Sequence, residues 1–71
     1  MPTLDLHGFR VDDVYDALDR FIRDAEAKGH ERVRIITGKG TGKVRDKAME
    51  YLRIAHYAPK AENEGSFWIA I

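Results

Sequence analysis

Apolar side chains recur every three or four residues in two stretches of the chain, which is the spacing of one face of an α-helix. The first helix is expected from Val11, with Gly29 after Lys28 as a glycine suited to its C-terminal end. The second is expected over 43–56, before Pro59, whose ring excludes further helix. The two apolar stripes consist of Val11, Val14, Tyr15, Leu18, Phe21, Ile22 and Ala25, then of Val44, Ala48, Tyr51, Leu52 and Ala55.

Four shorter segments have the character of strands. Residues 3–7 are a short apolar segment, and residues 33–37 are a β-branched run. Residues 66–71 alternate apolar and other side chains, which favours a last strand. Residues 57–61 are expected to form an irregular or edge strand, with a turn over 62–65. The order of elements is therefore βαβαββ.

This order predicts an α/β fold, a two-layer sandwich in which both helices cover one face of a mixed four-stranded sheet. The first two strands are expected to be parallel because a helix connects them, and the last two to form a hairpin. Residues 1–71 are expected to form a single domain. Strand alternation directs Leu4, Leu6, Val33, Ile35, Phe67, Ile69 and Ile71 toward the helices, and Asp5, His7, Arg34, Ile36 and Trp68 toward the uncovered face.

The net charge of zero hides an uneven distribution of charge along the chain. Residues 1–27 carry three basic and seven acidic groups, whereas residues 28–53 carry eight basic and three acidic groups, a net charge of +5. The basic segment indicates an anionic partner such as nucleic acid, although charges of this kind also serve simply to solvate helices. The chain has no cysteine, which excludes zinc–thiolate sites. It also lacks an apolar run near the roughly 20 residues of a membrane span, so a cytoplasmic domain without a membrane partner is expected.

Asp5 and His7 stand two residues apart, which places both side chains on one face of a strand. Histidine donates or accepts protons near neutral pH, and a neighbouring carboxylate would orient its ring. The alternative is a solvated aspartate beside a half-buried histidine at the sheet edge. The pair is a weak candidate for a metal site, since two side chains are too few to hold a metal ion alone.

A glycine-rich basic loop lies between the second strand and the second helix. Gly38, Gly40 and Gly42 allow close approach of the backbone to a ligand, and the helix N-terminus adds positive potential. The loop departs from the P-loop and dinucleotide-binding patterns, which disfavours nucleoside triphosphates and NAD. The alternative is a simple connection that caps the helix. The residues expected to bind phosphate or nucleic acid are Arg10, Arg34, Thr37, Gly38, Lys39, Gly40, Thr41, Gly42, Lys43, Arg45 and Trp68.

Trp68 is the single tryptophan of the chain, and alternation places it on the uncovered sheet face. An exposed tryptophan can stack on a nucleic-acid base. The alternative is that a neighbouring loop partly covers it.

The segments Leu4–Gly8 and Thr37–Gly42, in this order and separated by a helix and a strand, resemble the Smr domain, the small MutS-related domain. This domain occurs at the C-terminus of MutS2 proteins and as small stand-alone proteins. The resemblance covers nearly the whole chain and implies a compact α/β sandwich that nicks or cleaves DNA, or in some members RNA, in DNA repair or recombination. It assigns catalysis to Asp5 and His7. Many members carry histidine where this chain has Thr37. The replacement of that histidine removes one proton donor or phosphate ligand.

The leading prediction is therefore an Smr-like endonuclease domain that binds DNA or RNA. His7 would act as general acid or base, while Asp5 would orient it or join it at a divalent metal, Mg²⁺ or Mn²⁺. A non-catalytic nucleic-acid or ribosome adaptor is the first alternative. A protein-interaction module that uses Ile36 and Trp68 is the second. The isolated domain is expected to be monomeric.

Overall fold

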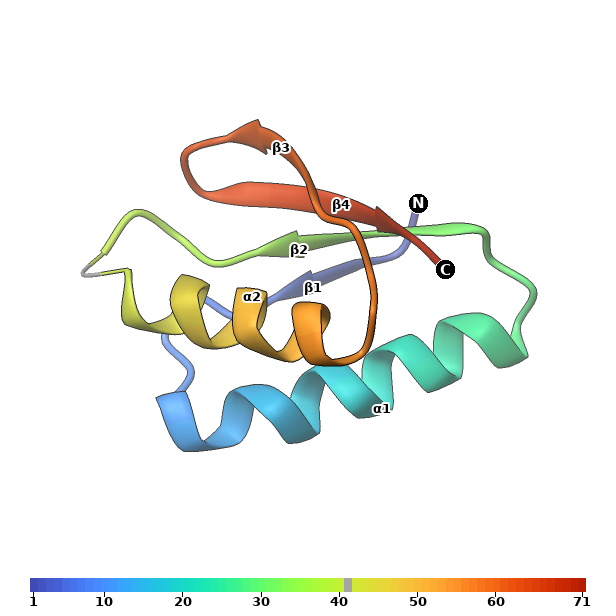
Figure 1. The fold of residues 1–71 in the computed structure, drawn as a ribbon, viewed down its shortest axis with the longest axis horizontal. Coiled ribbons are helices and arrows are strands. Elements are labelled where there is room, and N and C mark those ends of the chain that lie inside the picture. Colours follow the sequence, from blue (N-terminus) through green and yellow to red (C-terminus); the bar gives the residue numbers. More distant parts are fainter. Residues whose placement is uncertain (41) are drawn as a thin grey trace.

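The computed structural model describes residues 1–40 and 42–71, and it has the predicted order of helices and strands (Figure 1). A single 3₁₀ turn, η1, precedes the first helix. The elements are β1 (Thr3–Asp5), η1 (Val11–Asp13), α1 (Val14–Ala27), β2 (Arg32–Ile36), α2 (Lys43–Ile54), β3 (Lys60–Asn63) and β4 (Ser66–Ala70).

The four strands form one mixed sheet in the order β1-β2-β4-β3. β1 and β2 are parallel, because α1 returns the chain to the same end of the sheet, whereas β4 is antiparallel to both of its neighbours. Figure 1 shows both helices beneath one face of the sheet, with no helix on the other. The two-layer sandwich and the terminal hairpin predicted from the sequence are thus confirmed.

The core lies between the two helices and the covered face of the sheet. Phe67 and Ile69 of β4 and Val33 and Ile35 of β2 are completely buried there, as alternation predicts. From the helices, side chains such as Leu18 fill the same layer. Burying one aliphatic or aromatic side chain of this size contributes about 1.5–3 kcal/mol, so this layer is the main source of stability. In the part of the chain that the structure describes, no helix combines the length and apolar character needed to cross a membrane.

The helix ends explain why one boundary matches the prediction and another does not. Gly29 ends α1 at φ 81°, and the N–H of His30 donates to the carbonyl of Ala25 at 3.0 Å. The second helix ends at Ile54, two residues earlier than predicted, because His56 adopts the same left-handed conformation at φ 67°. The predicted C-terminal boundary of this helix was wrong because histidine, unlike glycine, does not indicate a left-handed backbone conformation.

β1 is also shorter than predicted, and this changes the position of His7. The strand ends at Asp5, after which the N–H of Phe9 donates to the carbonyl of Leu6 at 3.0 Å and closes a turn. Gly8 occupies the third position of that turn at φ 82°, where glycine is strongly favoured. His7 therefore lies in a turn beyond the strand and not on the strand itself.

The remaining strands shift along the chain relative to their predicted ranges. β2 begins and ends one residue earlier than predicted, at Arg32 and Ile36. β3 begins at Lys60 and ends at Asn63, because the α2 terminus uses the backbone up to Tyr57 before the strand can begin. The turn between β3 and β4 is thus reduced to Glu64 and Gly65.

Two tyrosines join the helices to each other. Tyr51 of α2 donates a 3.1 Å hydrogen bond to Asp19 of α1, and Tyr15 of α1 donates to Glu50 of α2. The two rings meet edge to face, with centroids 5.2 Å apart. Burial, together with the hydrogen bond to Asp19, raises the pKa of Tyr51 to about 12.

Candidate nucleic-acid interface

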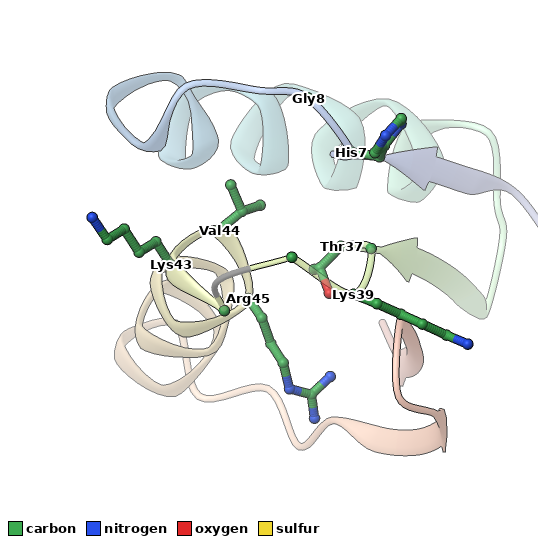
Figure 2. A pocket seen from close by; sticks show the side chains of 10 residues that line it. His7, Gly8, Thr37, Lys39, Lys43, Val44 and Arg45 are labelled. Carbon is green, nitrogen blue, oxygen red and sulfur yellow. The ribbon is translucent and has the colours of Figure 1, made fainter.

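A cavity of about 210 Å³ opens where β1 and β2 end and α2 begins (Figure 2). It is built from the turn after β1, the glycine-rich loop and the first turn of α2. Two segments that are far apart in the sequence, residues 7–8 and the stretch from Thr37 into α2, thus meet at the carboxyl ends of two parallel strands. The cavity is lined by His7, Gly8, Thr37, Gly38, Lys39, Gly40, Gly42, Lys43, Val44 and Arg45.

The side chains around this cavity favour an anion. His7, Lys39, Lys43 and Arg45 carry or can acquire positive charge, and none of the ten lining residues is acidic. Lys43 lies across the cavity from His7, and the side chain of Arg45 extends from α2 toward the β3–β4 hairpin (Figure 2). A negatively charged group in the cavity would be attracted by these side chains without repulsion from a lining carboxylate.

Backbone conformation at two glycines shapes the loop. Gly38 has φ 79° and Gly42 has φ 85°, a region that other residues rarely adopt. Gly42 is the N-cap of α2, and within the described residues no side chain caps this helix end. The N–H groups of its first turn, which have no partner inside the helix, are therefore available to an anion. Gly40 does not adopt a positive φ.

Gly65, which the sequence analysis did not select, anchors the start of the loop. Its carbonyl accepts the N–H of Thr37 at 2.8 Å and that of Gly38 at 3.2 Å, so these two loop amides are occupied. A Cβ on Gly65 would lie 3.5 Å from the carbonyl carbon of Gly38. Glycine at a strand end often allows two backbones to approach each other closely. This general property of glycine was the only feature of the sequence that could have pointed to Gly65.

Thr37 has a structural part in this contact. It is only 7% exposed, and its hydroxyl lies 3.5 Å from the same Gly65 carbonyl. Thr37 therefore forms part of the cavity wall while its N–H and its hydroxyl both donate to the β3–β4 turn. The loop is held to the hairpin through this residue.

Asp5 and His7 are neighbours, but the contact between them is through the backbone. The N–H of His7 donates to Oδ1 of Asp5 at 2.9 Å, and both residues are exposed. No hydrogen bond or ion pair between described residues joins the Asp5 carboxylate to the imidazole. Asp5 thus supports the turn that carries His7 to the cavity, and Asp5 itself does not line the cavity.

Arg45 has the most distinctive environment of the cationic residues. Its guanidinium lies over the ring of Phe67, 5.7 Å from the ring centroid. Its Nη1 is buried and has no hydrogen-bond partner among the described residues. A buried N–H donor without a partner is costly.

Three other predicted residues lie outside the cavity lining. Arg10 is exposed at the start of η1. Arg34 forms a two-point ion pair with Glu62 at 2.7 and 2.9 Å, which raises the pKa of Arg34 and lowers that of Glu62. Trp68 lies on the open sheet face, cross-strand from Arg34. Thr41, predicted as part of the loop, lies outside the described residues. Gly8 and Val44 line the cavity although the sequence analysis did not select them.

The donor set does not fit a metal site made by the protein alone. Over residues 1–40 and 42–71, no group of three or more histidine, cysteine or acidic side chains is close enough to hold a metal ion. Asp5 and His7 supply at most two ligands, and Oδ1 of Asp5 already accepts the N–H of His7.

A family comparison agrees with this arrangement. The model of the Smr domain matches residues 4–67, which include the turn, the loop and the start of the last strand. The chain belongs to the Smr domain family. The resemblance inferred from the two motifs is confirmed.

Relatives of this Smr chain are much longer proteins. The chain is 40% identical over 73 residues to the protein named Endonuclease MutS2 of Geobacillus thermodenitrificans. It is 44% identical over 52 residues to the protein of the same name from Symbiobacterium thermophilum. The two alignments cover 96% and 73% of this chain, but only 9% and 7% of the relatives. The chain thus corresponds to one small segment of these proteins.

The fold also matches a solved structure. The crystal structure of the Smr domain of Thermus thermophilus MutS2 superposes with a TM-score of 0.86 at 27% sequence identity. The match covers 99% of this chain and 96% of that one. The architecture of this chain is therefore that of the Smr fold.

Proposed function

We propose that this Smr domain binds nucleic acid through the cavity at the start of α2 and cleaves phosphodiesters there. The observation that carries the proposal is the lining of the cavity, which combines Lys39, Lys43, Arg45 and His7 with no acidic residue. The cavity also borders the first turn of α2, whose N–H groups have no partner inside the helix. A phosphate group would accept hydrogen bonds from these N–H groups and from the cationic side chains. The relatives named Endonuclease MutS2 support cleavage of nucleic acid as the activity.

The chemistry assigned to the cavity needs one proton-transfer group and several fixed positive charges. In hydrolysis a water oxygen forms a bond to phosphorus while the bond to the leaving sugar oxygen breaks. His7 would accept the proton of that water or donate one to the leaving oxygen. Lys43 and Arg45 would stabilise the negative charge that builds up on the phosphate oxygens. Asp5 would act as a positioning residue through the His7 backbone.

A second candidate function is a nucleic-acid or ribosome adaptor without cleavage. It is favoured by Thr37, which stands where many Smr members carry histidine and which bonds to Gly65. The cavity therefore holds one imidazole, His7, and no second proton donor of that kind. The same phosphate contacts would serve binding alone.

The binding proposal is tested by salt dependence. Affinity for a labelled oligonucleotide should fall steeply with salt, because each phosphate contact releases counterions. Lys43→Ala and Lys39→Ala should each reduce the magnitude of the slope of log K against log salt by about one unit. Lys28→Ala is the matched control, since Lys28 pairs with Asp24 outside the cavity lining. Equal effects of the cavity and control variants would refute the cavity as the phosphate site.

A cleavage assay then separates the two candidate functions. The purified domain is incubated with supercoiled plasmid and with structured RNA, in Mg²⁺, in Mn²⁺ or with a chelator. Nicking or cleavage that His7→Ala abolishes supports the endonuclease. Binding without cleavage under all three conditions supports the adaptor.

A further inference from the structure

The uncovered face of the sheet carries a second cluster of residues that the cavity does not use. Trp68 lies at the centre of this cluster and is partly exposed. Its cross-strand neighbours are Arg34 on β2 and Lys60 on β3. The guanidinium of Arg32 lies 5.3 Å from the centre of the Trp68 ring. One aromatic side chain is therefore surrounded by three cations, on a face that no helix covers (Figure 1).

The charges on this face are not all neutralised. Arg34 is paired with Glu62. In the described part of the chain, neither Lys60 nor Arg32 forms an ion pair with a carboxylate. Two cations therefore remain beside the indole, which complements a partner that is both aromatic and anionic. Single-stranded nucleic acid has both properties, because its bases stack while its phosphates are charged.

The sheet face leads directly to the cavity. Arg34 and Ile36 lie on the same face of β2, and the chain then continues into Thr37 and Gly38 of the cavity wall. At about 3.3 Å per residue, Gly38 is roughly 13 Å along the chain from Arg34, the partner of Trp68. A strand with one phosphate in the cavity would therefore reach Trp68 by passing over Ile36.

We propose that the open sheet face binds the unpaired bases of a single strand next to the phosphate held in the cavity, with Trp68 as the stacking residue. The inference rests on the proposed function and narrows its substrate to nucleic acid with a single-stranded segment. In a duplex the faces of the bases are stacked on one another and are closed to an indole ring. A base stacked on Trp68 would displace Arg32, whose guanidinium would then be free to contact a phosphate.

The single tryptophan makes this inference directly measurable in the unmodified chain. Three probes of equal length are titrated: a single-stranded oligonucleotide, a closed hairpin duplex, and a strand with the same phosphates but without bases. We expect the single strand to quench Trp68 fluorescence, and the duplex and the baseless strand to bind without quenching. Quenching of the same size by the baseless strand would overturn the proposal, since no base is present to stack.

Substitution tests the same contact through affinity. Trp68→Ala should weaken single-strand binding about 5- to 150-fold, which is the loss of one stacked base, and change hairpin binding less than twofold. Trp68→Phe retains an aromatic face and should retain most of the affinity. Ile54→Ala is the matched control, because Ile54 is an exposed apolar residue on α2, at 62% exposure. A circular dichroism spectrum and a melting curve establish that each variant is folded, and Arg32→Gln provides a second variant outside the core.

The outcomes separate this inference from the proposed function. If Lys43→Ala weakens all three probes while Trp68→Ala weakens none, the cavity binds phosphate and the sheet-face proposal is wrong. If Trp68→Ala weakens only the single strand while the cavity variants have no effect, the cavity is wrong as the phosphate site and the stacking contact stands. The sheet-face proposal would be overturned if Trp68→Ala reduced the affinity for the single strand and for the hairpin equally. A dimer that depends on Trp68, detected by sedimentation, would also overturn it.

Discussion

The backbone N–H of His7 donates a 2.9 Å hydrogen bond to the carboxylate of Asp5, two residues before it. The bond spans the point where β1 ends and the turn that carries His7 begins. Together with the left-handed Gly8 it sets the direction in which the chain leaves the sheet. Asp5 therefore acts on the cavity through the position of the His7 backbone.

Substitutions at these two positions should separate positioning from proton transfer. His7→Ala should reduce cleavage roughly 10²–10⁴-fold with little change in binding, which is the usual contribution of a general acid or base. Asp5→Asn keeps an oxygen that can accept the His7 N–H and should retain most of the activity, whereas Asp5→Ala should lose more. Cleavage rates and affinities of the three variants are compared side by side. A loss in Asp5→Asn as large as that in His7→Ala would show that the carboxylate charge itself is needed.

The glycines of the loop should respond differently to alanine. Gly38 has φ 79°, so Gly38→Ala should lower the free energy of unfolding by roughly 1–2 kcal/mol. Gly40 lacks a positive φ, and a Cβ there meets no atom within 4 Å. Gly40→Ala should therefore change the free energy of unfolding by less than about 0.5 kcal/mol. Denaturant unfolding measures both values.

Gly40 then provides a clean test of close ligand approach. Gly40→Val is expected to lose phosphate binding while both helices remain folded, because its side chain would occupy the space beside the ligand. Unchanged affinity in this folded variant would mean that the ligand does not approach the backbone at Gly40.

The tyrosine contacts between the helices predict a dependence of stability on alkaline pH. The pKa of Tyr51 is about 12 in the folded protein, above the ordinary value of 10.0. The unfolded chain therefore loses this proton first, and the stability that the contact contributes is present below pH 10 and is lost as the pH rises toward 12. The loss should be on the order of 1 kcal/mol, because solvent screens a group so close to the surface. Tyr51→Phe should have a flatter stability profile over this interval, measured by urea unfolding at each pH.

The end of α2 offers a stabilising substitution. His56 holds φ 67°, and the N–H of Tyr57 behind it donates to the carbonyl of Leu52 at 2.8 Å. Glycine adopts this conformation without steric cost, so His56→Gly should raise the free energy of unfolding by about 0.5–1 kcal/mol. The corresponding change at His30, which has no positive φ, is the control and should not stabilise. A lower melting temperature for His56→Gly would mean that the histidine side chain contributes more than the backbone strain costs.

Much of the fold followed from patterns that are local in sequence. The helical spacing of apolar residues identified both helices, and the alternation in 66–71 identified which side chains of β4 are buried. Parallel pairing of the first two strands followed from the single helix between them. These features depend on near neighbours along the chain and on general rules of handedness, so the sequence alone determined them.

The site was predicted only in part, because its details depend on contacts between distant segments. The sequence identified His7, Lys39, Lys43 and Arg45 as candidate site residues, and the tertiary structure brought them to one cavity. That Gly65 occupies the amides of Thr37 and Gly38 was decided by the pairing of β2 with β4, which brings residues 28 positions apart into contact. The same holds for the pairing of Arg34 with Glu62 and for the burial of Nη1 of Arg45. A residue's partners depend on which surfaces meet after folding, and no local pattern of apolar and polar positions carries that information.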